Sequence, residues 1–176
     1  MKPIPATGAA GSLVVDNGGY QERKPVARPT FADVCESRRR NMAAIRGKHT
    51  QPEMVVRRLV HRMGYRYRLH VRALPGCPDL VFPRHGKIIE VRGCFWHRHS
   101  GCARAAVPKT RRDFWQAKFD ATVERDSRNL DALQAAGWDV LVVWECEADD
   151  RALADRIRHF LAASTPVVHP PKVQGL

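Results

Sequence analysis

Long apolar runs are missing from this sequence of 176 residues. No stretch reaches the length of about 20 apolar residues that a membrane-spanning helix needs. The N-terminus also lacks the apolar run of roughly 7 to 15 residues that is typical of a secretory signal peptide. We therefore expect an intracellular protein whose thiols stay reduced. Its five cysteines then indicate metal binding or catalysis before disulfides.

Acidic residues are scarce as well. The chain has 18 Asp and Glu against 30 Lys and Arg, which gives a net charge of +12. Such an excess favours a polyanionic partner, most commonly nucleic acid, although a basic surface that serves only solubility would give the same charge. Much of the positive charge is arginine beside aromatic residues, as in Tyr65-Arg66-Tyr67-Arg68. Because arginine stacks on bases and grips phosphates through two hydrogen bonds, this pattern favours nucleic acid.

Both ends of the chain differ in composition from its middle. Residues 1–36 are rich in Gly, Pro and Ala and show no sustained periodicity, and residues 164–176 contain three prolines. Such composition is typical of mobile tails. The sequence therefore predicts one folded domain over residues 37–163, which is long enough to bury a core.

Hydrophobic periodicity predicts a first helix over residues 51–63. The apolar residues from Val56 to Met63 recur at helical spacing and form one stripe. Thr50, followed three residues later by Glu53, has the pattern of a capping box at the helix start. That pattern explains Glu53 without a catalytic role.

Strict alternation of apolar and basic residues over 65–72 predicts a half-buried strand. Short strands at 79–82 and 87–92 would complete an antiparallel meander. A continuous apolar run at 140–144 favours a buried strand that a helical crossover reaches, and residues 110–136 read as that long helix, or as two joined helices. With a last helix near 153–161, the order predicts an α/β fold in which a mixed sheet is flanked by helices.

The densest group of metal-binding side chains is Cys94, His97, His99 and Cys102, and Cys146 ends the later buried strand. Zinc prefers four thiolate and imidazole ligands in a tetrahedral arrangement. The three cysteines with one of the two histidines would complete such a site, although these residues alone do not say which histidine binds. The alternative is a chance cluster of buried thiols.

Two carboxylates are expected at the same end of paired strands. Asp79 follows Pro78, and Glu90 lies on the next strand, two residues before Arg92. Carboxylate oxygens in this arrangement could hold a hard cation such as Mg²⁺, and Arg92 could balance their charge or contact a phosphate. The alternatives are a Pro-Asp turn, an exposed strand glutamate and a solvated arginine.

A carboxylate interrupts the apolar face of the predicted helix 110–136, for which Thr110 and Asp113 would form a capping pair. Asp126 shares a stripe with Phe119, Val123, Leu130 and Leu133. A buried carboxylate is costly unless it is paired, so a cation or an imidazole partner is expected. If the helix bends near Arg125, Asp126 is simply exposed.

Together these residues resemble the very short patch repair (Vsr) endonuclease family over about residues 37 to 148. The matching motifs are Arg40-Asn41-Met42, Leu74-Pro75-Gly76-x-Pro78-Asp79, Gly93-Cys94-Phe95-Trp96-His97, Val107-Pro108, Phe114-Trp115, Val123-Glu124-Arg125-Asp126 and Val143-Trp144-Glu145-Cys146. The resemblance implies a restriction-endonuclease-like fold with a structural zinc site. It also implies Mg²⁺-dependent nicking of DNA 5′ to the thymine of a T:G mismatch left by deaminated 5-methylcytosine, which initiates very short patch repair.

The same resemblance implies a cytoplasmic, nucleoid-associated monomer that is functionally linked to a cytosine-5 DNA methyltransferase. By position, Asp79 would bind Mg²⁺ with the Val91 carbonyl, His97 would be the general base, Asp126 would orient it, and Glu53 would lie near the site. His99 would be the histidine that binds zinc, with Cys94, Cys102 and Cys146. Phe95, Trp96 and Trp115 would wedge into the DNA stack, although each is otherwise a candidate for the core.

Two positions depart from the family pattern, in which Thr and His precede Gly-Cys-Phe-Trp. Here these residues are Val91 and Arg92. Glu90 and Arg92 instead resemble a broader nuclease pattern, so the active site would be a variant. Two other functions compete with T:G nicking: a zinc-stabilised DNA-binding module that has lost cleavage, and a nuclease of the same fold that cuts another DNA structure.

Overall fold

The computed structural model describes residues 35–44, 47–148 and 151–163. The predicted tails, 1–36 and 164–176, therefore lie almost wholly outside the described residues. The chain divides into two compact units, Met1–Met42 and Ala43–Leu176. The first is described only around helix α1 (Glu36–Ala44), a largely polar helix that carries an Arg40–Glu36 ion pair. The sequence did not predict this helix, because it has no apolar stripe.

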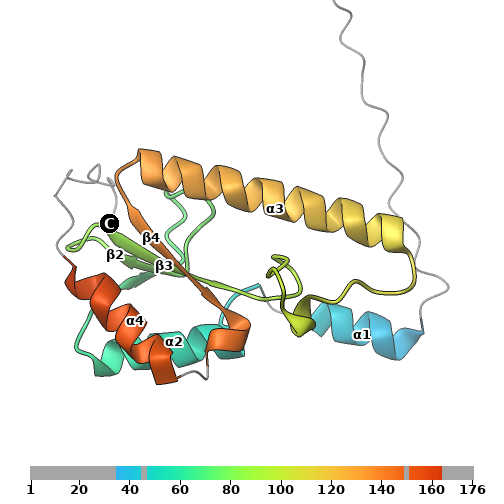
Figure 1. The fold of residues 1–176 in the computed structure, drawn as a ribbon, viewed down its shortest axis with the longest axis horizontal. Helices are drawn as coiled ribbons and strands as arrows, with labels where there is room; N and C mark the ends of the chain where they lie inside the picture. The colour runs from blue at the N-terminus through green and yellow to red at the C-terminus, as the bar shows by residue number, and fades with distance from the viewer. Residues whose placement is uncertain (1–34, 45–46, 149–150, 164–176) are drawn as a thin grey trace, which may run out of the picture. The chain divides into compact units, whose positions relative to one another are not determined.

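The second unit holds the remaining elements (Figure 1). They are α2 (Gln51–Arg62), β1 (Arg68–Leu69), β2 (Leu80–Phe82), β3 (Lys87–Arg92), α3 (Arg112–Ala135), β4 (Asp139–Trp144) and α4 (Arg151–Ala162), with two short 3-10 turns at Ala103–Ala105 and Glu145–Glu147. The sheet order is β1-β2-β3-β4, antiparallel from β1 to β3 and parallel between β3 and β4. The predicted meander and the helical crossover through α3 are confirmed.

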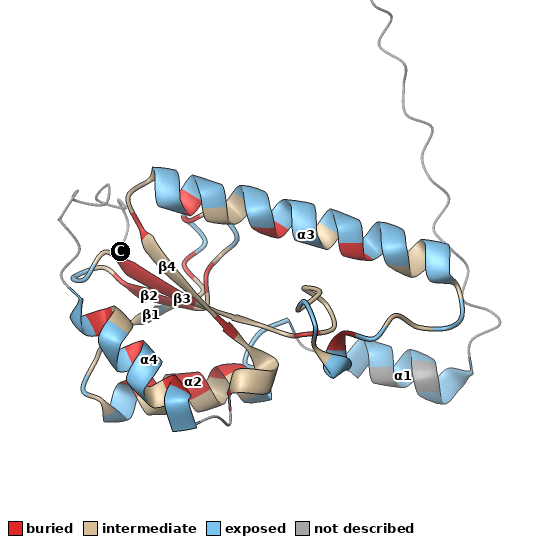
Figure 2. Cartoon of the chain, in the orientation of Figure 1, coloured by how far each residue is buried: buried red, intermediate tan, exposed pale blue. Residues whose placement is uncertain are grey.

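Helices cover both faces of the sheet (Figures 1 and 2). On one face, Val56 and Val60 of α2 pack with Ile157 of α4 against alternate residues of β2 and β3. On the other face, Leu133 of α3 packs in a second cluster with Val81 and Ile88. Because successive strand residues point to opposite faces, one short sheet serves both cores. Among the described residues, no helix is both long and apolar enough to cross a membrane.

Strand β1 is much shorter than the predicted strand 65–72. Tyr65 and Tyr67 are half-buried and Arg66 and Arg68 are exposed, as the alternation predicts, but only Arg68 and Leu69 join the ladder. His70 has a φ of 47°, in the left-handed region, and this conformation ends the strand. The side-chain pattern was therefore right and the strand length wrong.

Helix α3 is one continuous helix with two departures from expectation. Arg111 precedes it with a φ of 53° and provides no side-chain cap, so the predicted Thr110–Asp113 capping pair is wrong. Val123 is 45% exposed, whereas Asp126 is only 8% exposed. The helix does not bend to release Asp126, and a buried carboxylate therefore faces the body of the second unit.

Candidate active site and metal centre

Asp79 directly precedes Leu80, the first residue of β2, in a tightly constrained loop. Gly76 of this loop has a left-handed φ of +74°, and a Cβ added there would lie 2.9 Å from the amide nitrogen of Asn129 on α3. Only glycine suits such a close approach in this conformation. At the other side, the Val91 N–H donates a 2.8 Å hydrogen bond to Asp79 Oδ2. The loop and β3 together fix the carboxylate at one end of the sheet.

The surroundings of Asp79 are negative and partly shielded from water. Burial raises the pKa of Asp79 to about 6, and the carboxylates of Glu53 and Glu90 act in the same direction, against the Val91 N–H and His97. A bound cation would relieve this repulsion, and carboxylate and main-chain carbonyl oxygens are ligands that Mg²⁺ accepts. The residues present therefore fit a hard divalent cation.

Glu90, the second predicted carboxylate, is already paired. Arg92 donates from Nε and Nη2 to Glu90 Oε2 over 3.0 and 2.6 Å. Both side chains are largely shielded from solvent. Arg92 thus balances the charge of Glu90, one of the two roles considered for it, and its charge also reaches Asp126 and helps to lower the pKa of that carboxyl.

Glu53 is buried, at 2% exposure, in the first turn of α2. Its N–H donates to Thr50 Oγ1 over 3.4 Å, which is half of the predicted capping box. Its carboxylate, however, accepts a 2.6 Å hydrogen bond from the His49 N–H rather than from Thr50. The other carboxylate oxygen of Glu53, Oε1, makes no hydrogen bond among the described residues. Helix capping therefore does not account for this carboxylate.

His70 links Glu53 to Asp79. Its Nε2 lies 3.2 Å from Glu53 Oε1, and its Nδ1 lies 3.7 Å from Asp79 Oδ1. Burial lowers the pKa of His70, although Glu53 acts against that shift. Arg57 completes the cluster, with Nη1 at 3.6 Å from Glu53 Oε1 and 2.8 Å from His49 Nδ1. Sequence reasoning missed His70, because the alternating pattern placed it on the exposed face of a strand.

His97 and Asp126 form a hydrogen-bonded pair between the loop after β3 and helix α3. His97 Nδ1 bonds to Asp126 Oδ2, and Arg125 Nη2 donates to Oδ1 over 2.9 Å. Burial acts to raise the pKa of Asp126, but the hydrogen bonds from His97 and Arg125 outweigh it and leave the pKa lowered. The pair leaves Nε2 of His97 as the ring nitrogen able to exchange a proton with a substrate.

Four side chains converge at a second centre: Cys94, His99, Cys102 and Cys146. One ligand atom from each lies within 4.8 Å of the others. His99 Nδ1 is 3.6 Å from Cys94 Sγ and 3.3 Å from Cys146 Sγ, and its ring stacks on Trp144 with centroids 4.3 Å apart. This donor set suits zinc. His97 is not among the four side chains that converge there, and it pairs with Asp126 instead.

Phe95, Trp96 and Trp115 meet in one aromatic cluster. Ring centroids lie 5.1 Å apart for Phe95 and Trp96, 5.5 Å for Phe95 and Trp115, and 6.0 Å for the two tryptophans. All three rings are half-buried, and those of Phe95 and Trp115 rest on Phe119, which is 1% exposed. The cluster therefore has one anchored side and one accessible side.

Comparison with known proteins decides the family. The profile described as DNA mismatch endonuclease Vsr matches residues 32–104. The type II nicking enzyme V.XorIIP of Xanthomonas oryzae pv. oryzae is 49% identical over 130 residues, which cover 73% of this chain and 95% of that enzyme. The DNA mismatch endonuclease Vsr of Escherichia coli is 38% identical over 139 residues, covering 74% and 88%. The chain belongs to the Vsr family of DNA mismatch endonucleases.

Membership of the Vsr family confirms the resemblance drawn from the motifs and makes the chain a DNA endonuclease by family. The profile match includes Glu53, Asp79 and His97. Asp126 and Cys146 lie beyond it, and it is the fold that brings them to the two sites. The Vsr assignment thus rests on sequence, and the geometry adds the partners of each side chain.

Proposed function

We propose that this Vsr-family chain nicks one strand of duplex DNA on the 5′ side of the thymine in a T:G mismatch left by deaminated 5-methylcytosine. The observation that carries the proposal is that β3 and the loop after it bring together Asp79, which accepts a hydrogen bond from the Val91 N–H, and the hydrogen-bonded His97–Asp126 pair. An anionic metal ligand and an oriented imidazole are groups that can hydrolyse a phosphodiester. The mixed sheet with helices on both faces also suits the restriction-endonuclease-like fold that the family implies.

His97 is the proposed general base. With Nδ1 held by Asp126, Nε2 would accept the proton of the attacking water. Asp126 stays ionised because its pKa is lowered, so it would stabilise the imidazolium that forms. Arg125 holds the second oxygen of Asp126 and keeps the carboxylate in position.

Asp79, the Val91 carbonyl and Glu90 are the proposed Mg²⁺ ligands. Mg²⁺ bound there would stabilise charge on the attacking and leaving oxygens of the phosphodiester. Glu53 and His70 would position Asp79 on the side away from the substrate, since His70 lies between the carboxylates of Glu53 and Asp79. Arg92 is proposed to act electrostatically near the scissile phosphate, because a guanidinium does not deprotonate in the working pH range.

Zinc at Cys94, His99, Cys102 and Cys146 is proposed to be structural. Four protein donors leave no open position for substrate, which is typical of structural sites. The site joins the loop that carries His97 to the 3-10 turn directly after β4, where Cys146 lies. It would thereby hold the general base in a fixed position.

Recognition of the mismatch is proposed to depend on Phe95, Trp96 and Trp115. Apolar side chains inserted between base steps read how easily a duplex unstacks. The cluster rests on buried Phe119 with its accessible side outward, and Trp96 is the direct neighbour of His97. Insertion of the wedge would then place His97 at a fixed distance from the mismatch. A cytosine-5 DNA methyltransferase is the functional partner that such a substrate implies.

One assay tests this function. The full chain is incubated with Mg²⁺ and end-labelled duplexes that carry T:G, U:G or no mismatch. A nick in the T:G duplex alone, 5′ to the thymine, is the expected result. Nicking of all duplexes would instead support a nuclease with another target, and tight binding with no nick would support a DNA-binding module without cleavage.

A further inference from the structure

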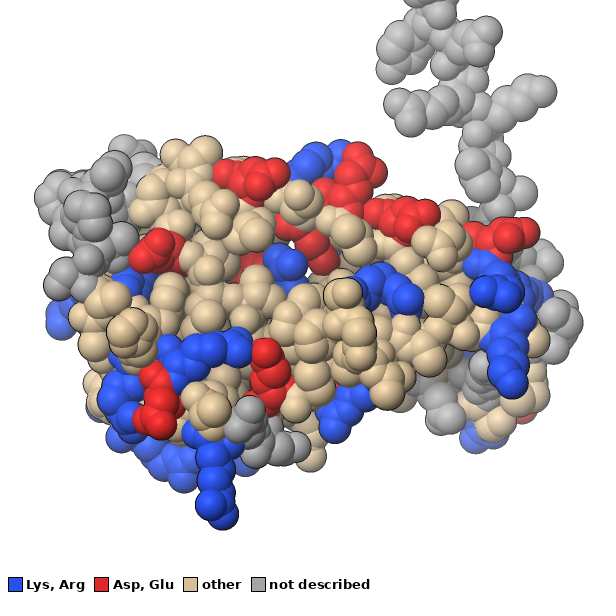
Figure 3. Space-filling model, in the orientation of Figure 1, with Lys and Arg blue, Asp and Glu red and all other residues tan. Residues whose placement is uncertain are grey.

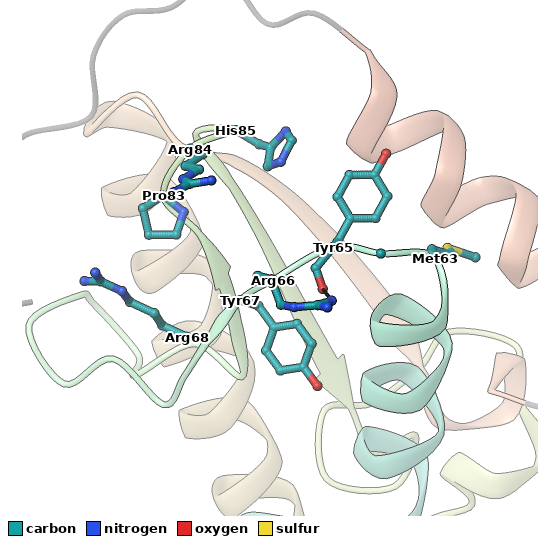
Figure 4. A pocket seen from close by; sticks show the side chains of 9 residues that line it. Met63, Tyr65, Arg66, Tyr67, Arg68, Pro83, Arg84 and His85 are labelled. Carbon is teal, nitrogen blue, oxygen red and sulfur yellow. Dashed lines mark hydrogen bonds between the residues drawn. The ribbon is translucent and has the colours of Figure 1, made fainter.

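Two grooves meet at Tyr67, at the end of the second unit where α2 finishes. One has a volume of about 570 Å³ and lies between the Met63–Arg68 segment and the Pro83–His85 turn, which form its two sides in Figure 4. The other, of similar volume, follows the outer face of α2. Tyr67 lines both grooves. We call this joint surface the arginine groove.

The arginine groove is lined by many cations. Its arginines are Arg66, Arg68 and Arg84 on the first side and Arg57, Arg58 and Arg62 on the second, with His61 and His85 beside them. Among the described residues, no Asp or Glu lines either groove. On the face drawn in Figure 3, basic side chains gather at the lower left, over α2 and α4, with some acidic side chains among them, and acidic side chains also lie along α3. The groove thus concentrates charge of one sign.

Several arginines outside the groove, such as Arg92, Arg125 and Arg156, pair with a carboxylate. Others, such as Arg72 and Arg151, are exposed and have no ion pair among the described residues. The groove differs in that its arginines lie together, and among the described residues only Arg57 of them has a carboxylate partner, Glu53. Arg58, Arg62, Arg68 and Arg84 are exposed and have no ion pair among the described residues. Like charges held together without counter-charges cost stability, so this surface is better explained by an external anion than by folding.

We infer that the arginine groove binds the phosphate backbone of the duplex on the far side from the nick. Glu53, in the first turn of α2, is linked to Asp79 through His70, and α2 ends at Arg62 in the groove. The helix rises about 13 Å from Glu53 to Arg62 at 1.5 Å per residue. Backbone phosphates of one strand rise about 3.4 Å each along the DNA axis. A strand that follows α2 from the scissile phosphate therefore reaches Arg62 after about four nucleotides. Tyr65 and Tyr67 supply rings and hydroxyls beside the arginines.

This inference rests on the DNA endonuclease activity of the family and not on the preference for T:G. Contacts to phosphates contribute affinity and salt dependence without reading sequence. The groove should therefore strengthen binding to matched and mismatched duplexes equally. It should leave the rate of nicking in the saturated complex unchanged, because none of its exposed arginines touches Asp79 or His97.

Salt-dependent binding tests the inference. The double variant Arg62→Gln/Arg84→Gln is compared with Arg128→Gln/Arg151→Gln, which removes the same charge from exposed positions on α3 and α4 outside the groove. Affinity for matched and T:G duplexes is measured without divalent metal from about 50 to 200 mM salt. Each lost phosphate contact lowers the salt slope by about 0.9, so the groove variant should lose about 1.8. Over that range, the affinity ratio of wild type to groove variant should fall about 12-fold.

Two further measurements complete the test. The double variant Arg62→Lys/Arg84→Lys should keep the wild-type slope, because phosphate contacts require only the charge. The groove variant should melt no lower than wild type, since repulsion between cations is relieved. Equal salt slopes for the groove variant and the control would overturn the inference and point to another anion, such as an acidic protein segment. A groove variant that loses T:G binding alone would overturn it too.

Discussion

Replacing Cys146 by serine should remove zinc and destabilise the fold. Cys146 Sγ lies 3.3 Å from His99 Nδ1 and supplies one of four donors. Structural zinc sites contribute about 10–16 kcal/mol of apparent binding free energy, so a quarter share for one ligand, about 3 kcal/mol, is the least that its loss should cost. At about 3 °C per kcal/mol for a domain of this size, the melting temperature should fall by at least about 10 °C. Metal analysis of purified protein and a thermal melt measure the two effects.

Cys77→Ser is the matched control, because Cys77 is half-buried but lies outside the zinc cluster. It should retain about one zinc per chain, as expected of a four-ligand site, and should melt close to wild type. If Cys146→Ser kept its zinc and melted at the same temperature as Cys77→Ser, the structural role of the site would be refuted. Loss of zinc with no change in melting would refute the coupling to folding.

Four other substitutions test the account. His97→Ala should slow nicking by about 10² to 10⁴ while duplex binding persists, the usual contribution of a positioned base; near-normal nicking would exclude it. Arg92→Lys should keep more activity than Arg92→Ala, and equal rates would mean that its charge is not used. Trp96→Ala should weaken binding to T:G duplex more than to matched duplex at unchanged melting temperature; an equal loss with lower melting would make it a packing residue. Gly76→Ala should cost about 1–3 kcal/mol more stability than Gly86→Ala, which shares a left-handed φ but meets no neighbour within 4 Å; equal losses would remove the Asn129 contact from the argument.

Periodicity predicted most of the fold, because a helix or strand that is buried on one face has apolar residues at regular spacing along its own sequence. The stripe on α2 was read correctly. The apolar run of β4 was read correctly as a strand, but it was expected to be buried and only Val143 of it is, because β4 lies at the edge of the sheet. The length of β1 was not predictable in the same way. His70 takes a left-handed conformation that ends the strand, beside two buried carboxylates that come from distant positions. Local patterning carries no information about such a partner set.

The candidate sites were predictable as far as residue types and family motifs reached. Composition and spacing marked the thiols and Asp126, but they could not separate His97 from His99. That distinction depends on which ring faces α3 and which faces β4, a consequence of tertiary packing. No sequence pattern marked Arg57 and His70 as site residues, because each occupies a position that the periodicity assigns to the solvent-exposed face. Their role becomes visible only in the fold, where both lie beside the carboxylate of Glu53.

The central claim is that Asp79 and His97 belong to one catalytic site that nicks mismatched DNA. Mapping the products of an end-labelled T:G duplex, cut by wild type and by Asp79→Asn in the presence of Mg²⁺, tests it most directly. We predict a single break 5′ to the thymine for wild type and none for Asp79→Asn, with equal duplex binding by both proteins, because a neutral amide replaces an anionic metal ligand. A break at the same position with Asp79→Asn, or equal cutting of matched duplex by wild type, would contradict the account.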